Sequence, residues 1–168
     1  MLINNAGIMY PDGAQGPVDD ELLRATVDTN LLGPVRMTSA LVEHLKTRDG
    51  AVVANVTSVL GFVPLAIAAV YRATNAALHS YTLSQRYLLR DSSVSFIEIA
   101  PPWVRTELMN SSEEQRAMPL DTFIAGAIEQ LGTDANEILV GPAVEMRANP
   151  GPGEHAWVNA FNDMWFEG

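Results

Sequence analysis

The sequence predicts an α/β fold, a doubly wound parallel sheet of about four strands with flanking helices. Two β-branched segments, residues 51–57 and 93–99, are separated by a helical pattern of about twenty residues. A strand, a helix and a second strand at this spacing are typical of a parallel βαβ unit with a right-handed crossover. The composition agrees, because 48% of the residues are apolar and only 18% are charged, which favours a folded core over disorder.

The first fifty residues are expected to form the end of one strand and two helices. We interpret residues 2–3 as the end of a short buried strand and residues 9–17, which are rich in Gly and Pro, as a turn. A helix is predicted from Asp19, because the acidic residues 19–21 favour the positive end of a helix dipole. A second helix is predicted over residues 34–48, since a proline suits its first turn and a glycine follows its end.

The remaining elements alternate in type, as a parallel sheet requires. They are a strand over 51–57, a helix over 70–90, a strand over 93–99, a helix over 120–131, a strand over 137–141, a turn over 149–153 and a C-terminal amphipathic helix. Residues 50–71 carry no charge and are long enough to span a membrane, but polar residues and a proline interrupt them. We interpret this segment as strand, loop and helix start, and residues 1–168 as a single domain.

Composition argues against several classes of function. The chain has 10 Lys and Arg against 20 Asp and Glu, and its net charge of −10 repels phosphate backbones and anionic lipids, so no nucleic-acid or membrane binding is predicted. Without cysteine the chain has no disulfides, thiolate nucleophiles or cysteine-based metal sites. The three histidines lie far apart in sequence, so we predict no metal site and expect each on a helix surface or in the core. The first residues do not resemble a signal peptide, which predicts a cytoplasmic protein.

Polar residues follow three of the predicted strands. Residues 5–7, Ser58 and Pro101 stand at carboxyl ends, and such ends line one crevice in an open parallel sheet. Tyr71 lies on the helix that follows Ser58, with Asn75 one turn further along the same face. A serine hydroxyl that hydrogen-bonds a substrate oxygen and a tyrosine that transfers its proton make a useful pair. The alternative interpretation is an ordinary loop serine and a packing tyrosine.

Five short segments occur in a distinctive order along the chain. They are Asn4–Gly7, Asn30, Thr57–Ser58, Tyr71–Asn75 and Pro101–Thr106. Together they resemble the classical short-chain dehydrogenase/reductase family, and residues 71–83 are also similar to bacterial reductases grouped with genes of teichoic-acid D-alanylation. The resemblance implies a Rossmann-like sheet and hydride transfer between NAD or NADP and a small-molecule carbonyl or alcohol.

The resemblance also implies a role for each matching residue. Tyr71 is expected to be the general acid or base, Ser58 the donor to the carbonyl oxygen, and Asn30 the residue that holds a water in the proton relay. Asn75 takes the catalytic position at which the family has a lysine. The residues implied to contact the cofactor are Asn5, Ala6, Gly7, Pro101, Val104 and Thr106.

The chain departs from the family pattern at two places. The family's lysine carries a charge that lowers the pKa of the neighbouring tyrosine, typically by about 1–3 pH units, whereas Asn75 offers only hydrogen bonds. The family's glycine-rich turn, Gly-x-x-x-Gly-x-Gly, which would hold the pyrophosphate, does not occur in the sequence. We therefore expect a truncated Rossmann-like sheet without the N-terminal nucleotide-binding half, and weak dinucleotide binding by the isolated chain.

Three hypotheses remain open at this point. The chain is an oxidoreductase impaired in isolation, a non-catalytic protein that binds a partner, or a remnant without function. We expect a homo-oligomer or a complementing subunit, because the first strand has an open edge. The family resemblance also implies a dimer contact through the helices over 34–48 and 71–90.

Overall fold

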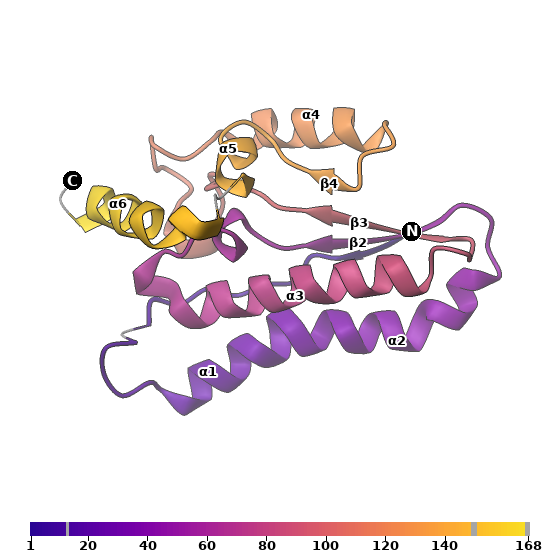
Figure 1. The fold of residues 1–168 in the computed structure, drawn as a ribbon, viewed down its shortest axis with the longest axis horizontal. Coiled ribbons are helices and arrows are strands. Elements are labelled where there is room, and N and C mark those ends of the chain that lie inside the picture. The colour runs from indigo at the N-terminus through magenta and orange to yellow at the C-terminus, as the bar shows by residue number, and fades with distance from the viewer. Residues whose placement is uncertain (13, 149–150, 167–168) are drawn as a thin grey trace.

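The computed structural model describes residues 1–12, 14–148 and 151–166. Four parallel strands form one sheet in the order β1 (Leu2–Asn4), β2 (Ala51–Val56), β3 (Val94–Ile99) and β4 (Glu137–Ile138). Helices cover both faces of the sheet (Figure 1). The predicted fold class and the number of strands are confirmed.

A group of helices lies on one side of the sheet, and another helix covers the opposite side (Figure 1). The first group is α1 (Asp20–Val27), α2 (Gly33–Lys46) and α3 (Ala69–Leu88), and the opposite face carries α4 (Leu120–Leu131). Asp19 caps α1 by accepting hydrogen bonds from the amides of Glu21 and Leu22. The helix ends predicted from the sequence agree with the observed ones to within about two residues, which is the usual uncertainty of helix ends.

The junction between α1 and α2 differs from the prediction. A five-residue π-helix, η1 (Asp28–Leu32), makes the chain continuous from α1 into α2. Pro34 has no amide to donate to the carbonyl of Asn30, and its ring would collide with that carbonyl in a regular α-helix. The chain widens there instead, and the amide of Gly33 bonds to the carbonyl of Asp28. Such π-helical turns frequently occur at functional sites.

Side chains of β2 and β3 alternate between two apolar clusters. Val53 and Phe96 pack with Leu45 of α2, whereas Ala54 and Ile99 pack with Phe123 of α4. This alternation follows from the two-residue period of a strand that is covered on both faces. Burial was also predicted for β1, but β1 is the edge strand and Ile3 is 55% exposed, so that prediction is wrong for Ile3.

Strand β4 is shorter than the predicted 137–141. The side chain of Gln130 pairs with both backbone groups of Leu139, donating to its carbonyl at 2.7 Å and accepting from its amide at 3.0 Å. The backbone of Leu139 is therefore occupied by α4 rather than by β3. The structure then continues through α5 (Ala143–Arg147), η5 (Gly151–Gly153) and α6 (Glu154–Phe166), while residues 149 and 150 of the predicted turn lie outside the described residues.

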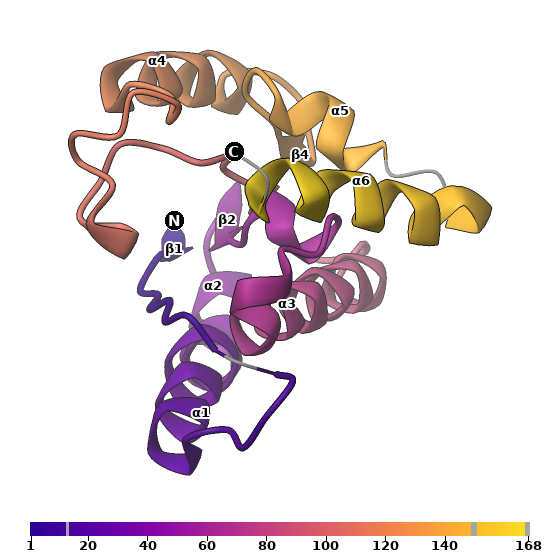
Figure 2. The ribbon, with the colours of Figure 1, turned by 90° about the vertical axis from the view of Figure 1, so that its left-hand side faces the viewer.

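Residues 50–71 form β2, the short helices η2 (Val59–Gly61) and η3 (Ala66–Ala68), and the start of α3, as predicted. Helix α6 packs on this segment through Phe161, next to the carboxyl ends of the strands (Figure 2). Asn162 fixes the contact, since its side chain accepts from the amide of Ala66 and donates to the carbonyl of Pro64. Within the described residues, no helix is long and apolar enough to cross a membrane.

Candidate active site

Ser58 and Tyr71 lie together at the carboxyl end of β2. Ser58 lies two residues beyond the end of the strand, and its Oγ accepts a hydrogen bond from the amide of Leu60 in η2. Tyr71 is the third residue of α3 and is only 8% exposed. Burial raises the pKa of the Tyr71 phenol above 10.0, while hydrogen bonds with the side chains of Ser58 and Asn75 act in the opposite direction. The structure thus brings three of the predicted site residues into one group.

Asn75 is buried on α3, one turn after Tyr71. Its Nδ2 donates to the backbone carbonyl of Tyr71 at 2.8 Å. The loop that carries Ser58 contacts the same turn of α3, because a Cβ on Gly61 would lie 3.2 Å from the backbone of Asn75 and Ala76. Glycine therefore allows the Ser58 loop to approach the helix that carries Tyr71.

Asn30 connects the π-helix to the loop after β1. Its Oδ1 accepts from the amide of Ile8 at 2.9 Å, and its Nδ2 donates to the carbonyl of the same residue at 2.8 Å. The same Nδ2 lies 3.4 Å from the Thr74 hydroxyl on α3. Asn30 is 7% exposed, so this side chain is a buried link between η1, α3 and the loop.

The residues with an implied cofactor contact lie at the ends of two strands. Asn5, Ala6 and Gly7 follow β1 and are exposed. Pro101 follows β3, and its carbonyl accepts from the amide of Val59 beside Ser58 at 3.1 Å. Val104 is buried and pairs with Met118 in an isolated bridge, and Thr106 is half-buried nearby in sequence. Because the strands are parallel neighbours, these segments share one edge of the sheet (Figure 2).

The sequence did not reveal the role of Asp12. Its carboxylate accepts from the amides of Ala69 and Val70, at 3.0 and 2.8 Å, and so caps α3 immediately before Tyr71. An aspartate in a turn-rich run gives no signal for a partner more than fifty residues away. A cavity of about 200 Å³ opens beside this cap, and Tyr10, Asp12, Leu22, Val70 and Tyr71 are among its lining residues.

A second buried network was also missed. Glu98 is fully buried on β3, where it accepts from the Thr57 hydroxyl at 2.7 Å and lies 2.6 Å from Nδ1 of His79. A glutamate in an otherwise apolar strand is the signal that could have indicated a buried polar partner. His79 is a half-buried residue of α3, whereas His44 and His155 are exposed on their helices, in line with the expected placements.

The residues present suit one end of a dinucleotide better than the other. The segments with an implied nicotinamide contact, Asn5–Gly7 and Pro101–Thr106, follow β1 and β3, and the second of them contacts the loop after Ser58 through the carbonyl of Pro101. The sequence contains no glycine-rich turn for the pyrophosphate, and Asn75 brings no charge to the ribose.

A comparison with known families decides the relationship. Residues 1–117 match the family model described as short chain dehydrogenase. The chain belongs to the short-chain dehydrogenase family. This assignment agrees with the resemblance that the five sequence segments indicate.

Individual members of the short-chain dehydrogenase family are similar over much of the chain. The uncharacterized oxidoreductase DltE of Bacillus subtilis is 40% identical over 119 residues, which are 70% of this chain and 47% of that protein. The C-signal protein of Myxococcus xanthus is 37% identical over 113 residues, covering 64% of this chain and 67% of that protein. A short chain dehydrogenase of Burkholderia cenocepacia, solved in complex with NADP, superposes with a TM-score of 0.82 at 27% identity, covering 92% of this chain and 67% of that one. The chain spans 47% and 40% of the first two curated relatives, DltE and the mouse estradiol 17-beta-dehydrogenase 2.

Proposed function

We propose that this chain is the catalytic part of an NAD- or NADP-dependent oxidoreductase that acts on a small-molecule carbonyl or alcohol. The observation that carries the proposal is the buried group of Ser58, Tyr71 and Asn75, with Asn30 fixed beside it. Family membership supports the reaction type, and the short chain dehydrogenase of Burkholderia cenocepacia was solved in complex with NADP. The roles of the individual site residues and the use of NAD or NADP by this chain are part of what we propose.

Each residue of the group has a chemical task in the proposed reaction. The nicotinamide cofactor supplies the hydride when bound. The Ser58 hydroxyl donates a hydrogen bond to the carbonyl oxygen of the substrate, and the Tyr71 phenol gives that oxygen a proton. Asn30 holds the water through which the phenol regains its proton. The cofactor ring is oriented by the backbone and side chains of two segments, which contribute Asn5–Gly7 and Pro101, Val104 and Thr106.

The raised pKa of Tyr71 slows the proton transfer in this reaction. Burial keeps the phenol protonated at neutral pH, and Asn75 supplies no positive charge that would stabilise the phenolate. A weaker acid transfers its proton less readily, and the phenolate form needed to oxidise an alcohol is scarce. We therefore propose that the isolated chain turns over slowly.

Assembly is the second part of the proposal. Strand β1 is at the edge of the sheet, with Met1 69% and Ile3 55% exposed, and an apolar edge of this kind pairs readily with another strand. We propose that a second copy or a complementing subunit covers this edge and supplies groups that hold the dinucleotide. Residues 1–168 then act as one domain, in the cytoplasm of a bacterium.

A calorimetric titration with NADPH and with NADH tests cofactor binding. We expect binding no tighter than about millimolar for the wild-type chain, and an aldehyde and ketone panel then tests turnover with the bound form. Tyr71→Phe and Ser58→Ala should each abolish any reduction, whereas Tyr87→Phe, at an exposed position on the same helix, should leave it unchanged. Turnover that survives in Tyr71→Phe would refute the proposed mechanism.

Asn75 favours a second candidate, a non-catalytic protein that binds a partner. The proposed assembly is common to both candidates, so sedimentation velocity should show a species larger than the 18.2 kDa monomer in either case. Only the oxidoreductase also binds a nicotinamide cofactor in that larger species. An assembled protein that does not bind NADH or NADPH would favour the second candidate.

A further inference from the structure

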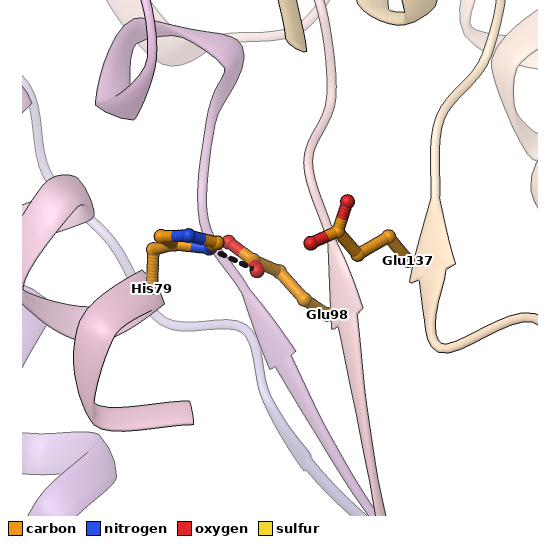
Figure 3. A group of neighbouring side chains, drawn as sticks. All are labelled: His79, Glu98 and Glu137. Atoms are coloured by element: carbon orange, nitrogen blue, oxygen red, sulfur yellow. Dashed lines mark hydrogen bonds and ion pairs between the residues drawn. The ribbon is translucent and has the colours of Figure 1, made fainter. Parts of the chain in front are cut away.

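Three side chains that the proposed reaction does not use converge on one point beside the sheet. His79 comes from α3, Glu98 from β3 and Glu137 from β4, and their potential ligand atoms all lie within 4.8 Å of one another. Figure 3 shows the imidazole and the two carboxylates directed toward the same region. We propose that these three residues form a binding site for a transition-metal dication of the zinc type.

The charge arrangement supports a cation at this point. Glu98 and Glu137 are direct partners in the parallel register of β3 and β4, so two like charges stand opposite each other on one face of the sheet. Glu98 is fully buried, and a buried carboxylate is costly unless positive charge balances it. A dication bound between the two carboxylates removes this repulsion.

The two glutamates differ in how their charges are balanced. Arg147 donates to both oxygens of Glu137, at 2.9 and 3.0 Å, and this hydrogen bonding lowers the pKa of Glu137. Within the described residues, the groups that hydrogen-bond to Glu98 are the Thr57 hydroxyl and the His79 imidazole. Neither of these two partners carries a permanent positive charge, unlike the Arg147 guanidinium at Glu137. Arg147 is thus the competitor for a cation at Glu137, and Glu98 is the anchor of the site.

The donor set selects the class of metal. One imidazole nitrogen and two carboxylates are typical zinc ligands, and a water completes a four-coordinate site. Magnesium and calcium prefer sites made of oxygen alone, so they are expected to bind more weakly. The Thr57 hydroxyl occupies Oε1 of Glu98 and leaves Oε2 facing His79, as groups behind a metal ligand commonly do.

Small movements bring the ligands to coordination distance. Two ligands at about 2.0–2.1 Å in a tetrahedral site lie roughly 3.3 Å apart. The Nδ1 of His79 and the Oε2 of Glu98 must therefore separate from 2.6 Å, and the widest pair must approach from 4.8 Å. Glu137 can make the larger movement, because its side chain is 23% exposed while that of Glu98 is buried. The metal replaces the hydrogen bond between Nδ1 and Oε2, and the proton of that bond leaves to solvent.

Calorimetric titration of the untagged, EDTA-treated chain with zinc chloride and cobalt chloride tests the site. We expect one saturable site, little heat with magnesium chloride, and a loss of affinity of at least about tenfold in His79→Gln and in Glu137→Gln. Arg147→Met should bind zinc more tightly than the wild type, since the competing charge is removed. His44→Gln and His155→Gln are the matched controls, because both histidines are exposed and lie on other helices.

Two results would overturn the proposal. One is a titration without saturable zinc binding up to about 1 mM, which is weaker than specific zinc sites require. The other is an affinity that His79→Gln leaves unchanged but that a control variant lowers, since the metal would then bind at the surface. If circular dichroism shows that His79→Gln does not fold, Glu137→Gln decides, and unchanged zinc affinity in that variant refutes the site. None of these outcomes depends on oxidoreductase activity.

Discussion

The cap that Asp12 places on α3 can be tested by one substitution. In Asp12→Ala the amides of Ala69 and Val70 lose their acceptors, which lie at 3.0 and 2.8 Å in the structure. The backbone hydrogen bond from the amide of Asp12 to the carbonyl of Ile67 remains available, so the loop keeps one of its contacts. Because Tyr71 directly follows Val70, the substitution loosens the end of α3 that carries the proposed acid.

The expected loss of stability in Asp12→Ala follows from the two hydrogen bonds that are removed. Removal of a capping side chain typically costs about 0.5–2 kcal/mol, and loss of a negative charge at a helix N-terminus adds about 0.3–1 kcal/mol. Asp12→Ala should therefore lower the free energy of unfolding by about 1–3 kcal/mol. In a protein of this size each kcal/mol corresponds to about 2–4 °C in Tm, so the Tm of Asp12→Ala should be roughly 2–12 °C below that of the wild type. Asp12→Asn retains one acceptor oxygen without the charge, so its Tm should lie between those of the wild type and Asp12→Ala.

Thermal unfolding by circular dichroism at pH 7 measures the effect. Asp49→Ala is the control, because Asp49 is an exposed aspartate in the turn after α2 and its removal changes the net charge equally. A Tm for Asp12→Ala within about 1 °C of that control would contradict the assignment of Asp12 as the cap of α3.

Three further outcomes follow from named contacts. Asn75→Lys should lower the phenol pKa of Tyr71 by about 1–3 pH units in a spectrophotometric titration, without raising carbonyl reduction above the slow rate proposed for the wild-type chain; a clear gain in turnover would contradict the view that weak dinucleotide binding limits activity. Arg147→Met, measured in EDTA, should cost about 1 kcal/mol or less at pH 7 and less still at pH 3. Arg147 lowers the pKa of Glu137, so their interaction stabilises the fold above the ordinary carboxyl pKa of 4.5, and this stabilisation is lost as the pH falls. An equal cost of the substitution at both pH values would refute this assignment. Asn162→Ala should detach α6 from Pro64 and weaken the near-ultraviolet circular dichroism of its tryptophans, and an unchanged spectrum would contradict this.

The fold was predictable because its signals are local. The β-branched run over 51–57 and the alternation over 93–99 are strand signals in themselves, and both strands are observed. The closeness of Ser58, Tyr71 and Asn75 could be expected because a strand end and a one-turn helix spacing place them without tertiary information, whereas Asn30 rested on the family resemblance alone. The π-helix before Pro34 was missed, although a proline so close after a predicted helix already indicates a disturbed turn.

The long-range polar contacts could not be predicted in this way. Asp12 meets α3 across 58 residues, and Glu98 meets Thr57 across 41, so neither pairing leaves a periodic pattern. Partner choice between such groups is settled only when the sheet register and the position of α3 are known. The group of His79, Glu98 and Glu137 was missed for the same reason, since its three residues come from α3, β3 and β4 and share no short sequence spacing.

The polar contacts of α3 explain how the proposed site keeps its geometry. Apolar packing on a sheet is non-directional and tolerates a helix that slides or rotates slightly. Three hydrogen-bonded connections remove that freedom: Asp12 at the first turn, His79 with Glu98 in the middle, and Thr82 with Asn55 of β2 further along. A buried polar group left unpaired costs about 1–3 kcal/mol, so each connection penalises a shift of the helix. Because Ser58 lies two residues beyond β2 and α3 carries Tyr71, the same connections set the distance between the two hydroxyl groups. The spacing of Ser58 and Tyr71 is thus a property of the sheet and its buried polar contacts, independent of whether a cofactor is bound.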